Sequence, residues 1–210
     1  MTKIYLISPP KIEIDSFLDQ LEIALTTEKV PVFQLRIKGY KDEDVIEIGK
    51  KVLKICHQYK TIFILNDRLD LALKIASDGV HLGGNDGDIM LARKNSPENF
   101  IIGASCYDSR HISTEAVEAG ANYVSFGSFF QSPTKNSKGK PTPEILEWCD
   151  EILNAQSVAI GGINADNCQD LVKAKADFVA VISYVWNNKN GVKWAVNNLA
   201  ASIEAATLLS

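Results

Sequence analysis

Several short apolar runs end in polar side chains of types that bind phosphate groups. The segment Gln34-Leu35-Arg36-Ile37-Lys38 alternates polar and apolar residues, so Gln34, Arg36 and Lys38 share one face of an extended chain. Two cations on a buried face must meet carboxylates or a bound anion, because an unpaired buried charge is costly. We expect these cations to hold an anion, and internal ion pairs in the core are the alternative.

Two carboxylates follow the next two apolar runs. Asn66-Asp67 ends one run, and Asp86 follows the other. Proteins commonly hold Mg²⁺ through one or two carboxylates, with water and phosphate oxygens completing the shell. Taken alone, Asp67 is better explained as the N-cap of the helix that should begin near Arg68. Together with the nearby cations, however, the two acids predict a magnesium–diphosphate site.

A polar loop after a later apolar run supplies further candidate ligands. It carries the hydroxyls Ser132 and Thr134 and the cation Lys135. We expect it to close over a phosphate group, and a solvated surface loop is the alternative. For Lys138 and Lys140, which lie further along, the solvated role is the expectation.

The elements that must position these residues alternate along the whole chain. Short β-branched or apolar runs are followed by stretches of helical period, the pattern of a parallel sheet covered by helices. The runs 62–65 and 179–182 are apolar throughout, as in parallel strands buried on both faces. Expected strands cover residues 4–8, 30–37, 61–65, 79–82, 100–104, 123–127, 157–160 and 178–183. Expected helices begin near residues 15, 42 and 141 and cover residues 68–76, 89–95, 111–119, 165–175 and 192–206.

Eight strand–helix units within 210 residues predict a closed (β/α)₈ or TIM barrel, forming a single α/β domain over residues 1–210. An open doubly wound sheet is the alternative, although the first strand-to-helix turn lacks the Gly-x-Gly-x-x-Gly of dinucleotide-binding folds. In a barrel, the carboxyl ends of the strands carry the chemistry, and the polar residues above fall there. Loops after the last two strands often bind phosphate through backbone N–H groups, so we expect a second anion site at Gly162 and at Ile182-Ser183.

Composition and charge exclude several functional classes. Hydrophobic residues make up 46% and charged residues 23%, as in ordinary globular proteins. The 22 Lys and Arg against 26 Asp and Glu give a net charge of -4, which offers no attraction for nucleic acid or an anionic membrane. The first apolar run stops at Pro9-Pro10, too early for a signal peptide or a membrane span. We expect a cytoplasmic protein, and the sequence leaves a homo-oligomer open.

The cysteines and histidines form no recognisable catalytic set. Cys56, Cys106, Cys149 and Cys168 are scattered without a Cys-x-x-Cys pair, which predicts free thiols. His81 lies within an expected strand, where a place in the core accounts for it, and His111 begins an expected helix. Neither histidine has a visible catalytic partner in the sequence. No Ser–His–Asp set or P-loop can be assembled.

The order of these motifs resembles the thiamine phosphate synthase family over essentially the full length. Any one of the motifs would be a weak signal, whereas several in the same order are a strong one. The resemblance is carried by the segments 34–38, 66–73, 78–83, 102–105, 126–127 with 134–135, 159–163 and 181–183.

This resemblance implies a barrel enzyme that joins 4-amino-5-hydroxymethyl-2-methylpyrimidine diphosphate to a thiazole phosphate and releases diphosphate. It implies Mg²⁺ as the cofactor, held by Asp67 and Asp86. Catalytic roles fall by resemblance on Arg36, Lys135 and Ser105. Implied substrate contacts are Arg36, Lys38, Asn66 and Lys135 for the diphosphate, Gln34 and Ser105 for the pyrimidine, Ser132 and Thr134 in the loop, and Gly162, Ile182 and Ser183 for the thiazole phosphate.

The family's chemistry needs little acid–base machinery. Diphosphate leaves first, and the thiazole nitrogen captures the resulting pyrimidine-methyl cation, so charge neutralisation and positioning supply the catalysis. A thiazole tautomerase of the same fold is one alternative, but its histidine after the fifth strand is replaced here by Ser105-Cys106-Tyr107. A non-catalytic binder of thiamine precursors is another, and Asp67, Asp86 and Lys135 argue against it.

Overall fold

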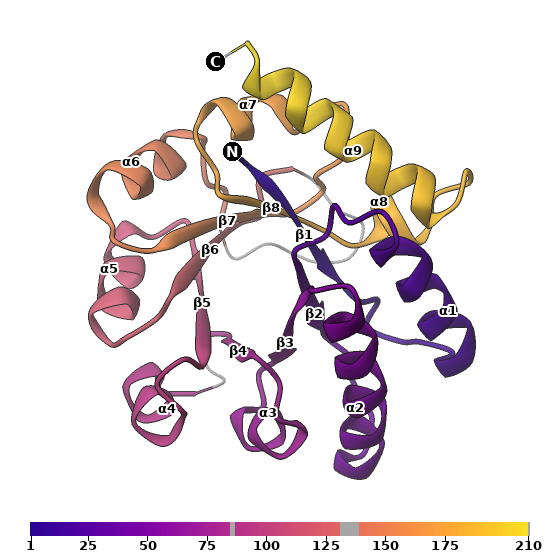
Figure 1. Cartoon of the computed structure of the whole chain (residues 1–210). Coiled ribbons are helices and arrows are strands. Elements are labelled where there is room, and N and C mark those ends of the chain that lie inside the picture. The colour runs from indigo at the N-terminus through magenta and orange to yellow at the C-terminus, as the bar shows by residue number, and fades with distance from the viewer. Residues whose placement is uncertain (85–86, 131–138, 210) are drawn as a thin grey trace.

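A closed barrel of parallel strands organises the chain (Figure 1). The computed structural model describes residues 1–84, 87–130 and 139–209. Within these residues each strand pairs with the next in sequence, and β8 pairs with β1. This confirms the (β/α)₈ prediction and rules out the open doubly wound sheet, because the sheet has no edge. The strands are β1 (Lys3–Ile7), β2 (Val32–Leu35), β3 (Ile62–Asn66), β4 (Gly79–Leu82), β5 (Ile101–Tyr107), β6 (Tyr123–Gly127), β7 (Gln156–Ile160) and β8 (Phe178–Val181).

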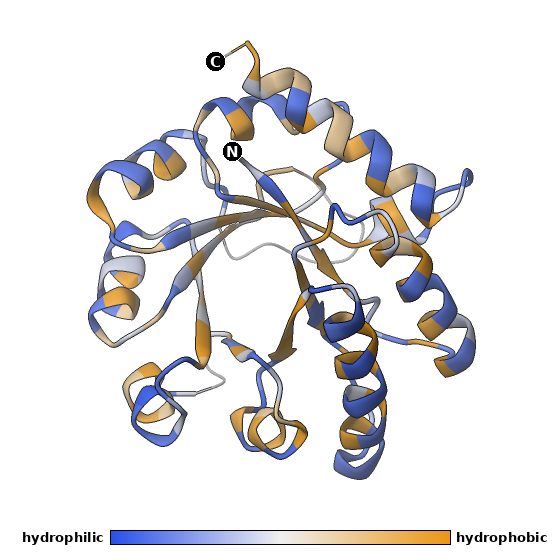
Figure 2. Cartoon of the chain, viewed as in Figure 1, coloured by the Kyte–Doolittle hydropathy of each residue, from blue (hydrophilic) through white to orange (hydrophobic). Residues whose placement is uncertain are grey.

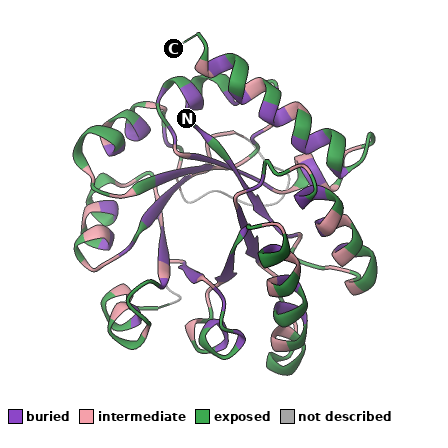
Figure 3. Ribbon diagram, in the orientation of Figure 1, coloured by how far each residue is buried: buried purple, intermediate pink, exposed green. Residues whose placement is uncertain are grey.

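Helices cover the outside of the barrel (Figure 1). Their apolar sides face the strands and their polar sides face solvent, which Figures 2 and 3 show as alternating colours along each helix. None of the described helices combines the length and the apolar character needed to cross a bilayer. The helices are α1 (Ile14–Leu25), α2 (Asp42–Gln58), α3 (Leu69–Ile75), α4 (Ile89–Asn95), α5 (Arg110–Glu118), α6 (Glu144–Ile152), α7 (Gln169–Lys173), α8 (Ser183–Trp186) and α9 (Val192–Thr207).

The bounds of several elements differ from the sequence prediction; β5, for example, continues to Tyr107, three residues beyond its predicted end. The strand β2 ends at Leu35, two residues before the predicted end. The helix predicted over 165–175 is reduced to α7, because Asn164 and Asn167 hydrogen-bond neighbouring backbone groups and form a turn instead. The short helix α8 was not predicted, since the apolar run of β8 continues into Ile182.

Apolar side chains form two layers separated by the strands. The larger layer lies between strands and helices, and the smaller one fills the inside of the barrel. Along β2, Phe33 and Leu35 belong to the outer layer and Val32 to the inner one, as the alternation of a strand requires. Gln34 lies on the same inner side as Val32 and is fully buried, so β2 presents a polar group inside the barrel.

At the amino-terminal end of the barrel, the residue just before each of β4, β6 and β8 uses its side chain to bind the neighbouring odd-numbered strand, β3, β5 or β7. In each case a side-chain oxygen accepts a hydrogen bond from the backbone N–H of the second residue of that strand. The bonds are Phe63 N to Asp78 Oδ2 (2.7 Å), Ile102 N to Asn122 Oδ1 (2.8 Å) and Ser157 N to Asp177 Oδ2 (2.8 Å).

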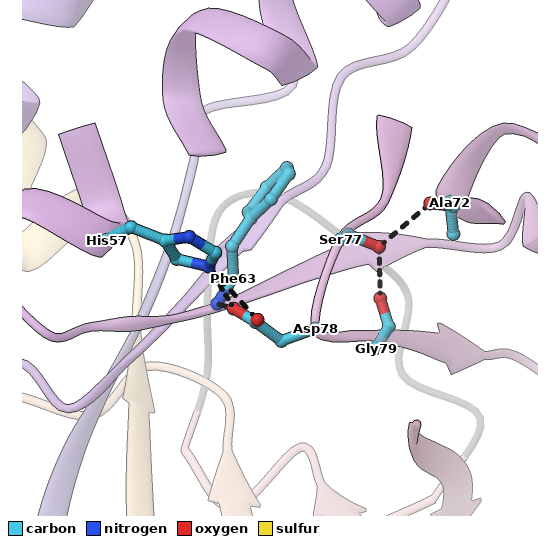
Figure 4. Close-up of polar contacts among 6 residues, drawn as sticks. All are labelled: His57, Phe63, Ala72, Ser77, Asp78 and Gly79. Carbon is cyan, nitrogen blue, oxygen red and sulfur yellow. Dashed lines mark hydrogen bonds and ion pairs between the residues drawn. The ribbon is translucent and has the colours of Figure 1, made fainter. Parts of the chain in front are cut away.

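The first of these bonds belongs to a larger polar cluster (Figure 4). Both carboxylate oxygens of Asp78 also lie 3.0–3.1 Å from Nε2 of His57, at the end of α2. The neighbouring hydroxyl of Ser77 lies 2.9 Å from the carbonyl oxygen of Gly79 and 3.3 Å from that of Ala72. This cluster ties α2 and α3 to the end of the barrel opposite the carboxyl ends of the strands. In barrels of this kind, that end contributes to stability.

Candidate active site

The described candidate residues meet at the carboxyl-terminal end of the barrel. Each lies in the last residues of a strand or in the loop that follows it, as the fold requires of an active site. Four of the candidates, Asp86, Ser132, Thr134 and Lys135, lie outside the described residues. Those placed by the structure are Gln34, Arg36 and Lys38 at β2, Asn66 and Asp67 at β3, Ser105 in β5, Gly162 after β7, and Ile182 and Ser183 after β8.

A hydrogen-bonded chain of side chains crosses the inside of the barrel and ends at Ser105. The Gln34 amide donates to the hydroxyl of Tyr5 at 3.0 Å, and Tyr5 and Tyr123 share a hydrogen bond of 2.8 Å between their hydroxyls. His81 continues the chain, with Nδ1 at 2.9 Å from the Tyr123 hydroxyl and Nε2 at 2.9 Å from Oγ of Ser105. The chain thereby fixes the relative positions of two candidate residues on non-adjacent strands, Gln34 on β2 and Ser105 on β5.

Burial makes this chain electrically neutral. It lowers the pKa of His81 to about 4, with a further contribution from the nearby Arg36 cation. Burial likewise raises the pKa values of the Tyr5 and Tyr123 hydroxyls well above their usual value. The His81 ring stacks on the Tyr123 ring, with centroids 5.5 Å apart. At neutral pH, therefore, His81 is an uncharged imidazole held at both nitrogens.

Sequence reasoning missed part of this chain. The core position of His81 is confirmed, and the structure gives it a hydrogen-bond partner among the candidate residues, Ser105, which was not visible in the sequence. Tyr5 and Tyr123 were read only as members of apolar strands. One available signal was that a tyrosine facing the inside of a barrel must find a partner for its hydroxyl.

The two cations after β2 lie differently from the prediction. Because β2 ends at Leu35, Arg36 and Lys38 lie in the loop beyond it; Arg36 is half-buried and Lys38 exposed. Their backbone N–H groups donate to Oγ of Ser8 (2.8 Å) and to the carbonyl of Pro10 (2.9 Å), which fixes the loop against the end of β1. Neither cation forms an ion pair with another described residue, so the alternative of internal ion pairs finds no support in this part of the chain.

Asp67 occupies a tight turn at the end of β3. Its φ is 66°, a left-handed conformation that non-glycine residues rarely adopt. The N–H of Arg68 donates to the carbonyl of Asn66 at 2.8 Å across this residue, as in the strained type of γ-turn. The N–H of Asp67 itself donates to the carbonyl of His81 at 2.7 Å. Since α3 begins after Arg68 without a side-chain cap, the structure does not support the capping role considered for Asp67.

The donors at this turn suit Mg²⁺. A half-buried carboxylate at Asp67 and a half-buried amide at Asn66 are oxygen ligands of the kind this ion prefers. The nearby carboxylates of Asp42 and Asp70 are both bound to Arg68. Among the described residues no group of three His, Cys, Asp or Glu side chains is placed to hold a metal. A site with one or two carboxylates, completed by phosphate and water, is compatible with that arrangement.

The expected second anion site is built from backbone. Gly161 and Gly162 have φ values of 111° and 62°, which other residues adopt only with strain. The carbonyl of Gly162 accepts from the Asn167 amide at 3.0 Å, which holds the loop after β7. The other part of this expected site follows β8, where α8 begins at Ser183. The Trp186 indole donates to the carbonyl of Ile7 at 2.6 Å and so ties α8 to β1.

The cysteines take no part in the site. All four are buried and unpaired, as predicted. Burial raises the pKa of Cys106 and that of Cys149 to about 12, so both are protonated thiols at neutral pH.

Comparison with known proteins identifies the family. Residues 4–185 match the family model described as thiamine monophosphate synthase. The chain is 42% identical over 210 residues to the thiamine-phosphate synthase of Erythrobacter litoralis, covering 98% of this chain and 97% of that protein. It is 41% identical over 186 residues to the thiamine-phosphate synthase of Pelagibacter ubique, covering 89% of each. A solved thiamine phosphate pyrophosphorylase from Pyrococcus furiosus superposes with a TM-score of 0.84 at 34% identity, covering 97% of this chain and 96% of that one. The chain therefore belongs to the thiamine monophosphate synthase family.

Proposed function

We propose that this protein is a thiamine-phosphate synthase, a transferase of thiamine biosynthesis. The observation that carries this conclusion is its 42% identity, over 98% of its length, to a curated thiamine-phosphate synthase. The polar residues at the carboxyl end of the barrel suit such a reaction, because they combine cations, oxygen ligands and an uncharged chain of hydrogen-bonded side chains. We further infer that residues 1–210 form one domain, since β1 closes the barrel against β8.

The substrates on this proposal are 4-amino-5-hydroxymethyl-2-methylpyrimidine diphosphate and a thiazole phosphate. Arg36, Lys38 and Asn66, together with Lys135, would bind the diphosphate. Their task is to stabilise negative charge as the bond between the methylene carbon and the diphosphate breaks. The absence of carboxylate partners for Arg36 and Lys38 among the described residues leaves both cations available for this role.

Asp67 and Asp86 would hold Mg²⁺ beside the diphosphate. When bound, the ion would neutralise charge on the leaving group. The oxygen donors at the β3 turn support this assignment for Asp67.

The pyrimidine would lie beside Gln34 and Ser105, at the two ends of the buried hydrogen-bonded chain. Departure of diphosphate leaves positive charge on the pyrimidine methylene, and a nearby imidazolium would oppose that charge. Burial keeps His81 uncharged at neutral pH. The hydrogen-bonded chain can therefore hold Ser105 in place without placing a positive charge beside the pyrimidine methylene. Arg36, Lys135 and Ser105 are the residues to which we assign the catalytic roles.

The tautomerase alternative has less support. It needs a base at the carboxyl end of the fifth strand, where this chain has Cys106 and Tyr107, the last two residues of β5. The Cys106 thiol is buried and burial raises its pKa to about 12, so it is a poor base at neutral pH.

The direct test incubates purified protein with both substrates and Mg²⁺ and measures thiamine phosphate and diphosphate. We expect equal amounts of the two products. Asp67→Asn and Asp86→Asn should raise the Mg²⁺ concentration for half-maximal activity by about tenfold or more. Asp19→Asn, which removes an exposed carboxylate on α1, should leave it unchanged. Absence of thiamine phosphate at saturating substrate and Mg²⁺ would remove the proposed function.

A further inference from the structure

Arg68 joins three elements beside the proposed metal ligand. Its Nη1 and Nη2 each lie 2.8 Å from a carboxylate oxygen of Asp42, the first residue of α2. Its Nε and Nη2 lie 2.8 and 2.7 Å from the oxygens of Asp70, in the first turn of α3. Figure 1 shows α2 and α3 next to each other on the outside of the barrel. The guanidinium therefore ties the starts of two helices to the loop after β3.

The geometry of this cluster is more specific than that of an ordinary surface ion pair. A planar guanidinium that binds one carboxylate with two parallel bonds is fixed in orientation, and the second carboxylate fixes it further. Both acids lie at helix N-termini, where the helix dipole favours a carboxylate. The hydrogen bonds from Arg68 hold the pKa values of Asp42 and Asp70 below their usual range, so both stay ionised.

The cluster acts on a residue that needs to be held. Asp67 directly precedes Arg68 and has a left-handed backbone that persists only where the surroundings impose it. On one side it is fixed by β3 and by its N–H bond to the carbonyl of His81 at the end of β4. On the other side, it is fixed by Arg68 and the two carboxylates. Hydrogen bonds therefore hold the backbone on both sides of Asp67.

We propose that Arg68 is a positioning residue whose two carboxylate partners hold the β3 turn, so that Asp67 and Asn66 face the metal–diphosphate site. The proposal rests on the proposed function, because it assigns Asp67 to a metal. Arg68 itself would touch neither metal nor substrate, since its hydrogen bonds are directed to Asp42 and Asp70.

The test compares three changes to the cluster with a matched control. Arg68→Ala removes the guanidinium and all its hydrogen bonds to Asp42 and Asp70. Arg68→Lys keeps the positive charge but cannot form the paired bonds. The double variant Asp42→Asn/Asp70→Asn removes both negative charges and leaves Arg68 in place. Lys175→Ala removes another exposed ion pair, Lys175–Asp150 at 2.8 Å, on the α6–α7 side. For each variant we would measure the Mg²⁺ requirement, the KM for the thiazole phosphate, the thermal midpoint, and calorimetric binding of Mg²⁺ with inorganic diphosphate.

Arg68→Ala and the double variant should each weaken Mg²⁺–diphosphate binding and raise the Mg²⁺ requirement by about tenfold. Arg68→Lys should fall between these variants and the wild type. The KM for the thiazole phosphate should stay unchanged, and Lys175→Ala should match the wild type in Mg²⁺ requirement.

Two results would overturn the positioning role. A lower thermal midpoint with unchanged Mg²⁺–diphosphate binding would make the cluster structural only. A loss in Arg68→Ala that the double variant does not share would mean that Arg68 contacts the ligand directly. Failure of the proposed function is separate: it would appear as no thiamine phosphate from the wild type, or as an unchanged Mg²⁺ requirement in Asp67→Asn.

Discussion

Protonation of His81 should make the protein less stable in acid. In the folded protein burial lowers the pKa of this histidine from 6.5 to about 4. Between those two values the unfolded chain binds a proton that the folded chain does not, so the free energy of unfolding falls as pH falls. The stabilisation is complete above pH 6.5, is lost progressively on acidification, and levels off below pH 4. Replacing His81 by Gln keeps a hydrogen-bonding side chain but removes the titration.

The expected size follows from the two pKa values. They differ by about 2.5, and each unit corresponds to about 1.36 kcal/mol, so the full loss is about 3 kcal/mol. By pH 5.5 about 1 kcal/mol of this would already be lost. Such a change is a large fraction of a typical unfolding free energy of about 5–15 kcal/mol.

Urea unfolding at pH 7.5, 5.5 and 4.5 measures the effect. The wild type should lose about 1 kcal/mol more than His81→Gln between the first two values, and about 2–3 kcal/mol more by pH 4.5. His111→Gln, which replaces an exposed histidine on α5, serves as the control and should retain the wild-type pH dependence. Equal losses in the wild type and in His81→Gln would refute the reasoning, since His81 would then titrate alike in both states.

Three further changes test other parts of the site. Lys135→Ala should lower kcat with little change in KM, because the loop cation acts on charge that develops in the transition state. Steady-state kinetics measures both constants, and a rise in KM alone would contradict this role. Gly162→Asn, which tolerates the φ of 62°, should raise the KM for the thiazole phosphate several-fold more than that for the pyrimidine diphosphate; equal rises in steady-state assays would contradict a phosphate contact there. Gly103→Ala would drive a methyl group into the Tyr123 ring, so urea unfolding should show a loss of about 1–3 kcal/mol, and an unchanged midpoint would contradict this packing.

The barrel could be predicted from local pattern, whereas the polar contacts of the site could not. Short apolar runs bounded by turn residues located β4 and β6 at the observed residues, even though His81 and Ser125 interrupt them. The end of β2 was misplaced, since Arg36 and Lys38 continue the alternation after the pairing has stopped. The hydrogen-bonded chain from Gln34 to Ser105 depends on which side chains meet across the barrel interior. The sequence of a single strand does not determine those contacts.

The three side-chain bonds at the amino-terminal end of the barrel also belong to a sequence pattern that recurs along the chain. Residues 77–82, 121–126 and 176–181 share one pattern: a small residue, Asp or Asn, any residue, Val, any residue and a large apolar residue or Val. In each copy, the acidic or amide side chain binds the same position of the preceding strand. The strands β4, β6 and β8 therefore begin with the same local arrangement, whereas Pro31 stands at the corresponding position before β2.

These copies of the pattern, together with the segment that begins at Val30, differ on the inner face of the barrel. Three residues after the acceptor, each unit presents a side chain on the inner face of its strand. Two copies carry Gln34 and His81, which belong to the polar chain, and the other two carry the small residues Ser125 and Ala180. The even-numbered strands thus place polar groups of the hydrogen-bonded chain on the β2–β4 side of the barrel interior and small, buried side chains on the β6–β8 side.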